Sequence, residues 1–185
     1  MGGNQRSVWG EPFVTVTRAA AEVADLADSG EVRISPFYTT PAFPAGSGPD
    51  YVNAAMTLRT ALSPDALLAA LHRIEAAAGR QRDARWGPRT LDLDLLAVGD
   101  VVRPDREGFD HWRNLPSDQQ ATTQPDQLIL PHPRLQDRGF VLAPLADVAP
   151  DWRHPVLDRT VAQMLAALPS EALQGITPLP PVNLA

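Results

Sequence analysis

Two carboxylates at alternate positions are the side chains of this chain best placed to do chemistry. Asp92 and Asp94 alternate with three leucines, Leu91, Leu93 and Leu95. Because successive side chains of a strand point to opposite faces, we expect the leucines to enter a core. Both acids then share the other face, with Cα atoms roughly 6.5–7 Å apart. Such a pair can bind hard cations such as Mg²⁺, although the alternation alone is equally typical of a strand with one solvated face.

Arginines cluster directly before the two acids. Four of them fall within ten residues: Arg80, Arg82, Arg85 and Arg89. A planar guanidinium binds two phosphate oxygens at once, so this stretch could hold a phosphate chain. On charge alone, a solvated loop with Asp83 as counter-ion is the favoured interpretation.

Composition is that of an ordinary globular protein. The chain has 185 residues, of which 44% are hydrophobic and 21% are charged, enough for one domain with a core. Its net charge of −6 argues against broad nucleic-acid binding. Without cysteine it can form no disulfide, thiol nucleophile or cysteine-ligated metal site. We find no apolar run of about 20 residues and no secretory pattern, so we expect no membrane partner and a cytoplasmic location.

Hydrophobic periodicity predicts an alternation of helices and strands. We expect helices from Pro12 to about Gly30, after the Ser63-Pro64 cap as far as Gly79, after Asp137, and after a Thr160 cap. Strands are expected over 32–38, broken at Pro36, over 51–60, and around Asp92 and Asp94. Residues 39–50 and the polar stretch 103–127 are expected to be loops, and 174–185 a disordered tail. The order indicates an α+β sandwich in a single domain over 1–173.

One strand carries two further polar side chains on a shared face. In 51–60, Tyr51 and Asn53 fall on the face opposite Val52, Ala54 and Met56. Asn53 offers both a hydrogen-bond donor and an acceptor, and Tyr51 offers an aromatic surface. Taken alone, they are ordinary strand residues.

The stretch Trp86-Gly87-Pro88-Arg89-Thr90-Leu91-Asp92-Leu93-Asp94-Leu95 resembles the signature of the hydroxymethyldihydropterin pyrophosphokinases of folate biosynthesis. The likeness extends over about residues 2–168. It implies a ferredoxin-like α/β sandwich with an antiparallel sheet, in which ATP gives a pyrophosphoryl group to a reduced pterin and leaves as AMP. It also implies two Mg²⁺ ions held by Asp92 and Asp94, with ATP as co-substrate.

The resemblance further assigns roles to individual residues. It implies that Arg82 and Arg89 act with the two acids in catalysis. A pterin pocket is implied at Thr40, Pro41, Tyr51, Asn53, Trp86 and Phe140. ATP contacts are implied at Glu75, Arg80, Arg82, Trp86, Arg89, His132 and Arg138. Without the family, Phe140 is almost as typical of a core helix.

The sequence departs from the family at two places. It opens Met1-Gly2-Gly3-Asn4, which matches a family turn but not the central strand that precedes it, so we expect the first central strand to be missing. The second departure is the insertion 103–127. Gln127 and Ile129 stand where some family members carry nucleotide-contacting polar residues, and Pro133 replaces a frequent aromatic residue. An inactive nucleotide- or pterin-binding remnant, or a domain of a larger folate enzyme, are the alternatives. We expect a monomer.

Overall fold

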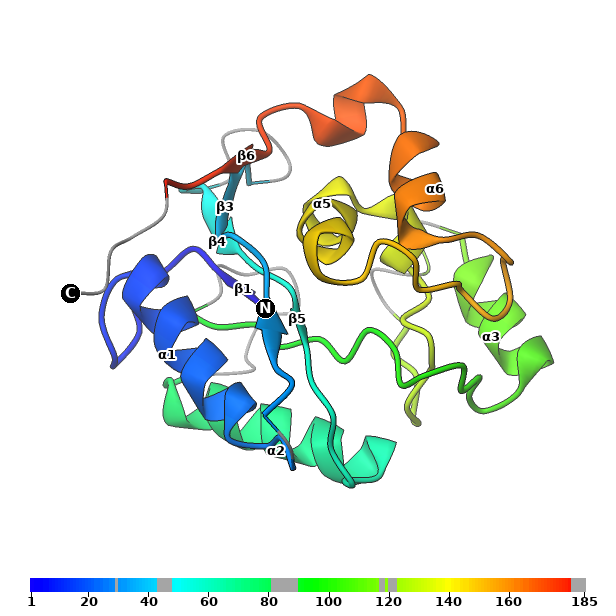
Figure 1. Cartoon of the computed structure of the whole chain (residues 1–185), viewed down its shortest axis with the longest axis horizontal. Coiled ribbons are helices and arrows are strands. Elements are labelled where there is room, and N and C mark those ends of the chain that lie inside the picture. Colours follow the sequence, from blue (N-terminus) through cyan, green and yellow to red (C-terminus); the bar gives the residue numbers. More distant parts are fainter. Residues whose placement is uncertain (29, 43–47, 81–89, 117–118, 120–122, 181–185) are drawn as a thin grey trace.

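A computed structural model describes residues 1–28, 30–42, 48–80, 90–116, 119 and 123–180. Strands lie between two helix pairs, with α1 (Pro12–Ala24) and α2 (Pro64–Ala77) on one side and α5 (Gly139–Val148) and α6 (Val161–Ala166) on the other (Figure 1). This arrangement confirms the predicted α+β class with helices covering an antiparallel sheet.

The main sheet is antiparallel and has the order β1-β4-β3-β6. Its strands are β1 (Gly2–Gly3), β3 (Tyr38–Thr40), β4 (Tyr51–Asn53) and β6 (Thr177–Pro178). A second antiparallel pair joins β2 (Arg33–Ile34) to β5 (Met56–Thr57). Pro36 separates β2 from β3, because proline cannot donate to a ladder.

The place of the first central strand is held by the short strand β1. Gly2 pairs with Asn53 on one side, and on the other side Gly2 and Asp92 exchange two backbone hydrogen bonds of 2.9 and 2.7 Å. The expectation of a missing strand is therefore corrected to a two-residue strand. A Cβ on Gly2 would lie 2.1 Å from Asn53 Oδ1, so this close approach requires glycine.

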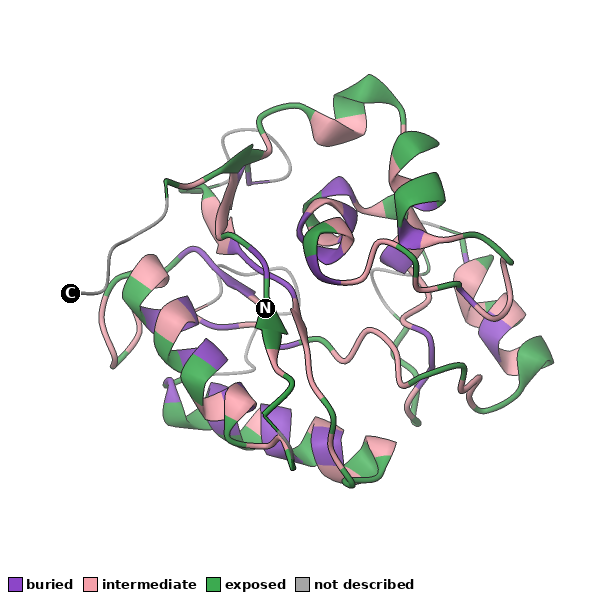
Figure 2. Cartoon of the chain, viewed as in Figure 1, coloured by how far each residue is buried: buried purple, intermediate pink, exposed green. Residues whose placement is uncertain are grey.

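Helices α1 and α2 bury their apolar faces against the segment that carries the two acids. Ser63 caps α2 by accepting a hydrogen bond from the Ala66 N–H (3.3 Å), as the sequence predicts. The core formed here contains Val16, Val23, Leu71, Ile74, Leu91 and Leu93 (Figure 2). Asp92 makes only an isolated bridge, so 91–95 is not a full strand. The predicted burial is confirmed for Leu91 and Leu93, whereas Leu95 is only half-buried.

Helices α5 and α6 form a second core with the 3₁₀ turn η1 (Leu135–Asp137). Its buried members include Leu135, Leu142, Leu145, Val161 and Met164. Thr160 and Gln163 form a reciprocal capping box at the start of α6, with hydrogen bonds of 3.0 and 3.2 Å. Because α5 also contacts β3 and β4, this core fixes the start of α5 against the sheet.

Two segments predicted to lack structure are partly ordered. Helix α3 (Arg106–Arg113) lies inside the polar stretch 103–127, capped by Asp105 and anchored by the fully buried Phe109. In the predicted tail, which follows the 3₁₀ turn η2 (Ser170–Leu173), β6 pairs with β3, and the Leu179 N–H donates to Phe37 O at 2.7 Å. Within the described ranges, we find no helix that is long and apolar enough to cross a bilayer.

Candidate active site

A cavity of about 320 Å³ lies between the sheet and the start of α5. Five of the six residues predicted to form a pterin pocket line it: Thr40, Pro41, Tyr51, Asn53 and Phe140. The sixth, Trp86, lies outside the described residues. Both acids and Arg138 also line this space, which we call the sheet cavity. The fold thus brings together side chains separated by up to a hundred positions in the sequence.

Asn53 and Thr40 form the polar wall of the sheet cavity. Both side chains are buried, and Asn53 Nδ2 donates to Thr40 Oγ1 at 2.7 Å. This bond orients the Asn53 amide, while Gly2 lies close against its Oδ1. A fixed amide leaves one defined pattern of donor and acceptor toward a ligand.

Phe140 also lines the sheet cavity, from the first turn of α5. Its side chain is 40% exposed, so the alternative of a core helix residue is wrong. The guanidinium carbon of Arg138 lies 5.7 Å from the Phe140 ring centroid, which is a cation–π distance. A partly exposed aromatic face is therefore available at this cavity.

Asp92 pairs with an arginine that also contacts a buried glutamate. Arg80 Nη1 lies 2.8 Å from Asp92 Oδ1 and also contacts Glu75 Oε1. Glu75 is 2% exposed, and its Oε1 accepts a hydrogen bond from the Leu93 N–H at 2.7 Å. It does not line the sheet cavity or the second cavity described below. Its contacts hold Arg80 and the Leu93 backbone in place, and the nucleotide contact expected from the sequence stays a prediction.

The pair Asp92 and Asp94 fits a cation whose remaining ligands come from water or substrate. Among the described residues, no group of three or more carboxylate, histidine or cysteine side chains could enclose a metal ion. Mg²⁺ is commonly held by one or two carboxylates, with water and substrate phosphates completing its shell. Asp92 and Asp94 match that donor set.

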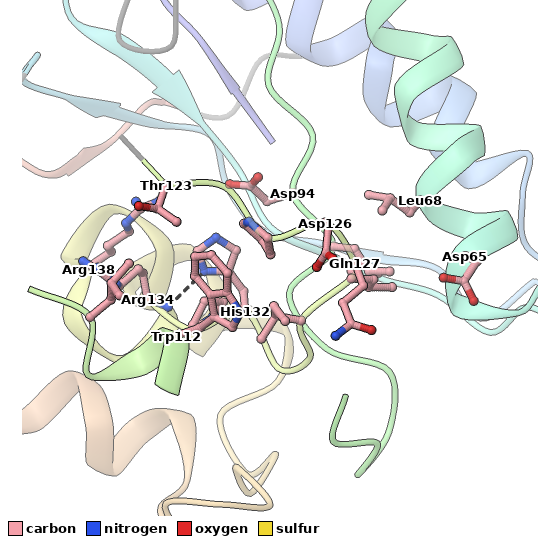
Figure 3. A pocket seen from close by; sticks show the side chains of 16 residues that line it. Asp65, Leu68, Asp94, Trp112, Thr123, Asp126, Gln127, His132, Arg134 and Arg138 are labelled. Atoms are coloured by element: carbon pink, nitrogen blue, oxygen red, sulfur yellow. Dashed lines mark hydrogen bonds between the residues drawn. The ribbon is translucent and has the colours of Figure 1, made fainter. Parts of the chain in front are cut away.

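A second cavity, which we call the large cavity, has a volume of about 750 Å³, and Figure 3 shows the side chains that line it. Asp94 and Arg138 line both spaces, so the cavities adjoin at these two side chains. The lining of the large cavity combines His132, Arg134 and Arg138 with the acids Asp65 and Asp126. It also includes apolar side chains, which are Leu68, Leu95, Leu115, Leu128 and Ile129. A mixed lining of this kind can receive a ligand that has an anionic part and a flat apolar part.

His132 is held as a neutral hydrogen-bond donor. The Arg134 N–H donates to His132 Nδ1 at 3.1 Å, which leaves the ring proton on Nε2. Burial lowers the pKa of His132, against the opposing effect of Asp94, and Arg138 lowers it further. The ring is therefore neutral at pH 7 and suited to donate to a phosphate or ribose oxygen.

The residues predicted to contact ATP and the residues that surround the large cavity overlap only in part. Arg80, His132 and Arg138 lie around it, whereas Arg82 and Arg89 fall outside the described residues. Arg134 and Trp112 also line the large cavity but were not predicted. The sequence signal for Arg134 is its position two residues after His132.

Comparison with known proteins agrees with this geometry. Residues 1–150 match the family model for 7,8-dihydro-6-hydroxymethylpterin-pyrophosphokinase. A 2-amino-4-hydroxy-6-hydroxymethyldihydropteridine pyrophosphokinase of Pseudomonas aeruginosa is 38% identical over 166 residues, 90% of each chain. Proteins of the same name from Synechocystis and Methylorubrum extorquens are 41% and 34% identical over 160 residues. Those alignments span 86% and 85% of this chain and 71% and 87% of the relatives.

Proposed function

The chain belongs to the 7,8-dihydro-6-hydroxymethylpterin-pyrophosphokinase family, and we propose that it catalyses the reaction that gives the family its name. ATP would give its pyrophosphoryl group to 6-hydroxymethyl-7,8-dihydropterin, yielding the pterin diphosphate and AMP in folate biosynthesis. The observation that carries this proposal is the junction of the two cavities at Asp94 and Arg138. Two substrates that exchange a group need adjoining sites with charge-stabilising side chains between them.

The sheet cavity suits the pterin. A flat two-ring heterocycle fits between the aromatic surfaces of Tyr51 and Phe140, with its polar edge toward Asn53. The Asn53 amide, oriented by Thr40, would pair with a donor and an acceptor on that edge. The hydroxymethyl group would then point toward Asp92 and Asp94.

The large cavity suits ATP. Its triphosphate would lie along His132, Arg134 and Arg138, with the donor Nε2–H of His132 and the guanidinium groups on phosphate oxygens. Arg82 and Arg89 would complete these phosphate contacts, and Trp86 would help exclude water, as the resemblance implies. Glu75 keeps Arg80 and the Leu93 backbone in place, and so fixes the direction of both acids.

Catalysis rests on positioning and on charge. Asp92 and Asp94 would hold two Mg²⁺ ions, which when bound neutralise the charge that develops on the bridging and leaving oxygens. The pterin hydroxyl attacks the β-phosphorus, the bond from that phosphorus to the α-phosphate oxygen breaks, and AMP leaves. No protein nucleophile is needed, so the chain's task is to align the hydroxyl with the phosphorus. We further propose that the protein acts as a cytoplasmic monomer.

The test is AMP release from ATP with Mg²⁺, with and without 6-hydroxymethyl-7,8-dihydropterin. We expect AMP and the pterin diphosphate in equal amounts, and only when the pterin is present. The control variant Asp147→Asn lies outside both cavities and should react like the parent protein. Binding of both ligands without AMP would refute the enzymatic proposal and indicate the inactive-remnant alternative.

A further inference from the structure

Described residues of the inserted stretch 103–127 form part of the wall of the large cavity. Six of the residues lining that cavity come from it: Trp112, Leu115, Thr123, Pro125, Asp126 and Gln127. Among the described residues that line this space, Trp112 is the one large aromatic side chain. An insertion that only extended the surface would not supply so much of the wall of a functional cavity.

The helix that carries Trp112 is fixed to the body of the protein. Phe109, one turn earlier, is fully buried and packs against His154 with ring centroids 5.4 Å apart. Before the helix, Arg103 and Leu130 exchange backbone hydrogen bonds of 2.8 and 3.2 Å. Arg103 Nη1 also lies 2.6 Å from Asp65 Oδ2 on α2. These contacts hold the Trp112 indole at a set place without requiring any closing motion.

Trp112 lines the large cavity together with His132, Arg134, Gln127 and Leu68, which are labelled with it in Figure 3. The indole is only half-buried, so an aromatic surface remains for a ligand. A nucleotide whose phosphates lie at the arginines would place its nucleoside in the same cavity, where this ring is available to it. Aromatic rings stack on nucleobases through a π-face that every base offers.

We propose that Trp112 binds the nucleoside of ATP, and that the insertion is therefore a nucleotide-binding element of this enzyme. This inference rests on the proposed function for the identity of the nucleotide. The inference gives Trp112 a role in the affinity for ATP and no role in the acid pair or the sheet cavity. Changing Trp112 should therefore weaken binding of the nucleoside, while the affinities for the triphosphate and for the pterin stay the same.

The test compares Trp112→Leu, which keeps apolar bulk on the helix, with Trp112→Phe, which keeps an aromatic face. Glu107→Gln, an exposed change on the same helix, is the matched control. Calorimetry would measure binding of α,β-methylene-ATP and of inorganic tripolyphosphate, each with Mg²⁺. We expect the Kd for the nucleotide analogue to rise five- to tenfold in Trp112→Leu and less than threefold in Trp112→Phe. Tripolyphosphate binding should stay unchanged in all three variants.

Two results would overturn the inference. One is an unchanged Kd for the analogue in Trp112→Leu, and the other is an equal loss of tripolyphosphate binding, which would indicate damage to the phosphate site. Steady-state assays add a second readout, in which the KM for ATP rises and the KM for pterin does not. If the parent protein binds the analogue but releases no pterin-dependent AMP, the proposed function fails while the binding comparison still decides the role of Trp112.

Discussion

The buried carboxylate of Glu75 gives the sharpest test of how this site is built. Its Oε1 accepts from the Leu93 N–H at 2.7 Å and contacts Arg80, which in turn lies 2.8 Å from Asp92. Glu75→Ala removes the partner of one buried backbone donor and one of the two carboxylates beside Arg80. We therefore expect both lower stability and a displaced acid pair.

The magnitude follows from the burial of each group. An unsatisfied buried N–H costs about 1–3 kcal/mol, and breaking a buried ion pair costs about 3–5 kcal/mol. The Arg80 side chain is 19% exposed and keeps Asp92 as a partner, so the second cost falls well below that range. We expect Glu75→Ala to lower the free energy of unfolding by about 2–4 kcal/mol. Glu75→Gln still offers an oxygen to Leu93, so its loss should be about half as large.

Urea unfolding of both variants measures the stability loss, and the Mg²⁺ dependence of AMP release measures the displacement of the acids. The apparent Mg²⁺ requirement should rise in both variants, while the KM for pterin stays unchanged. Glu22→Ala removes an exposed helical carboxylate paired with Arg18, and it should cost less than about 0.5 kcal/mol. A Glu75→Ala protein as stable as that control, with an unchanged Mg²⁺ requirement, would refute the positioning role.

Three further changes test other parts of the structure. Asp94→Asn should reduce Mg²⁺-dependent turnover about 100-fold or more while thermal unfolding stays close to the parent, and retained turnover would exclude Asp94 as a metal ligand. Gly2→Ala places a Cβ 2.1 Å from Asn53 Oδ1 and should displace the Asn53 amide. The KM for pterin should then rise about tenfold with no change in the KM for ATP. An unchanged KM for pterin would count against Asn53 as a ligand-binding residue. Burial lowers the pKa of His154 to about 4, so the stability contributed by its neutral form is complete above about pH 6.5 and is lost as the pH falls toward 4. We expect the free energy of unfolding to drop by about 2 kcal/mol between pH 7 and pH 5, and His154→Gln to show a shallower slope in urea titrations at the two pH values; equal slopes would contradict this origin.

The parts of the fold with strong local signals were predictable from sequence. The Ser63-Pro64 cap, the Thr160 cap and the alternation of Leu91 and Leu93 each follow from a short-range rule, and the structure confirms all three. The grouping of Tyr51 and Asn53 on one face also needed only the period of a strand.

Long-range pairing explains what sequence reasoning missed. Helix α3 is eight residues long and has one fully buried anchor, Phe109, with Trp112 as its second large apolar position, so it is too short to show a clear period. Strand β6 consists of Thr177 and Pro178, and it is ordered because β3 offers an edge, which the local composition cannot reveal. Glu75 lies on a helix with an otherwise apolar face, and only the fold shows that its carboxylate meets Leu93 and Arg80.

The side chains shared by the two cavities couple the binding affinities of the two substrates. Because Asp94 and Arg138 line both spaces, a ligand that reorients either side chain in one cavity changes the other cavity as well. Any factor by which the nucleotide alters pterin affinity must then equal the factor by which pterin alters nucleotide affinity. The potency of an inhibitor that binds one cavity alone would consequently change with the concentration of the substrate that binds the other cavity. A molecule that occupies both cavities across Asp94 and Arg138 would not depend on this coupling between the two affinities.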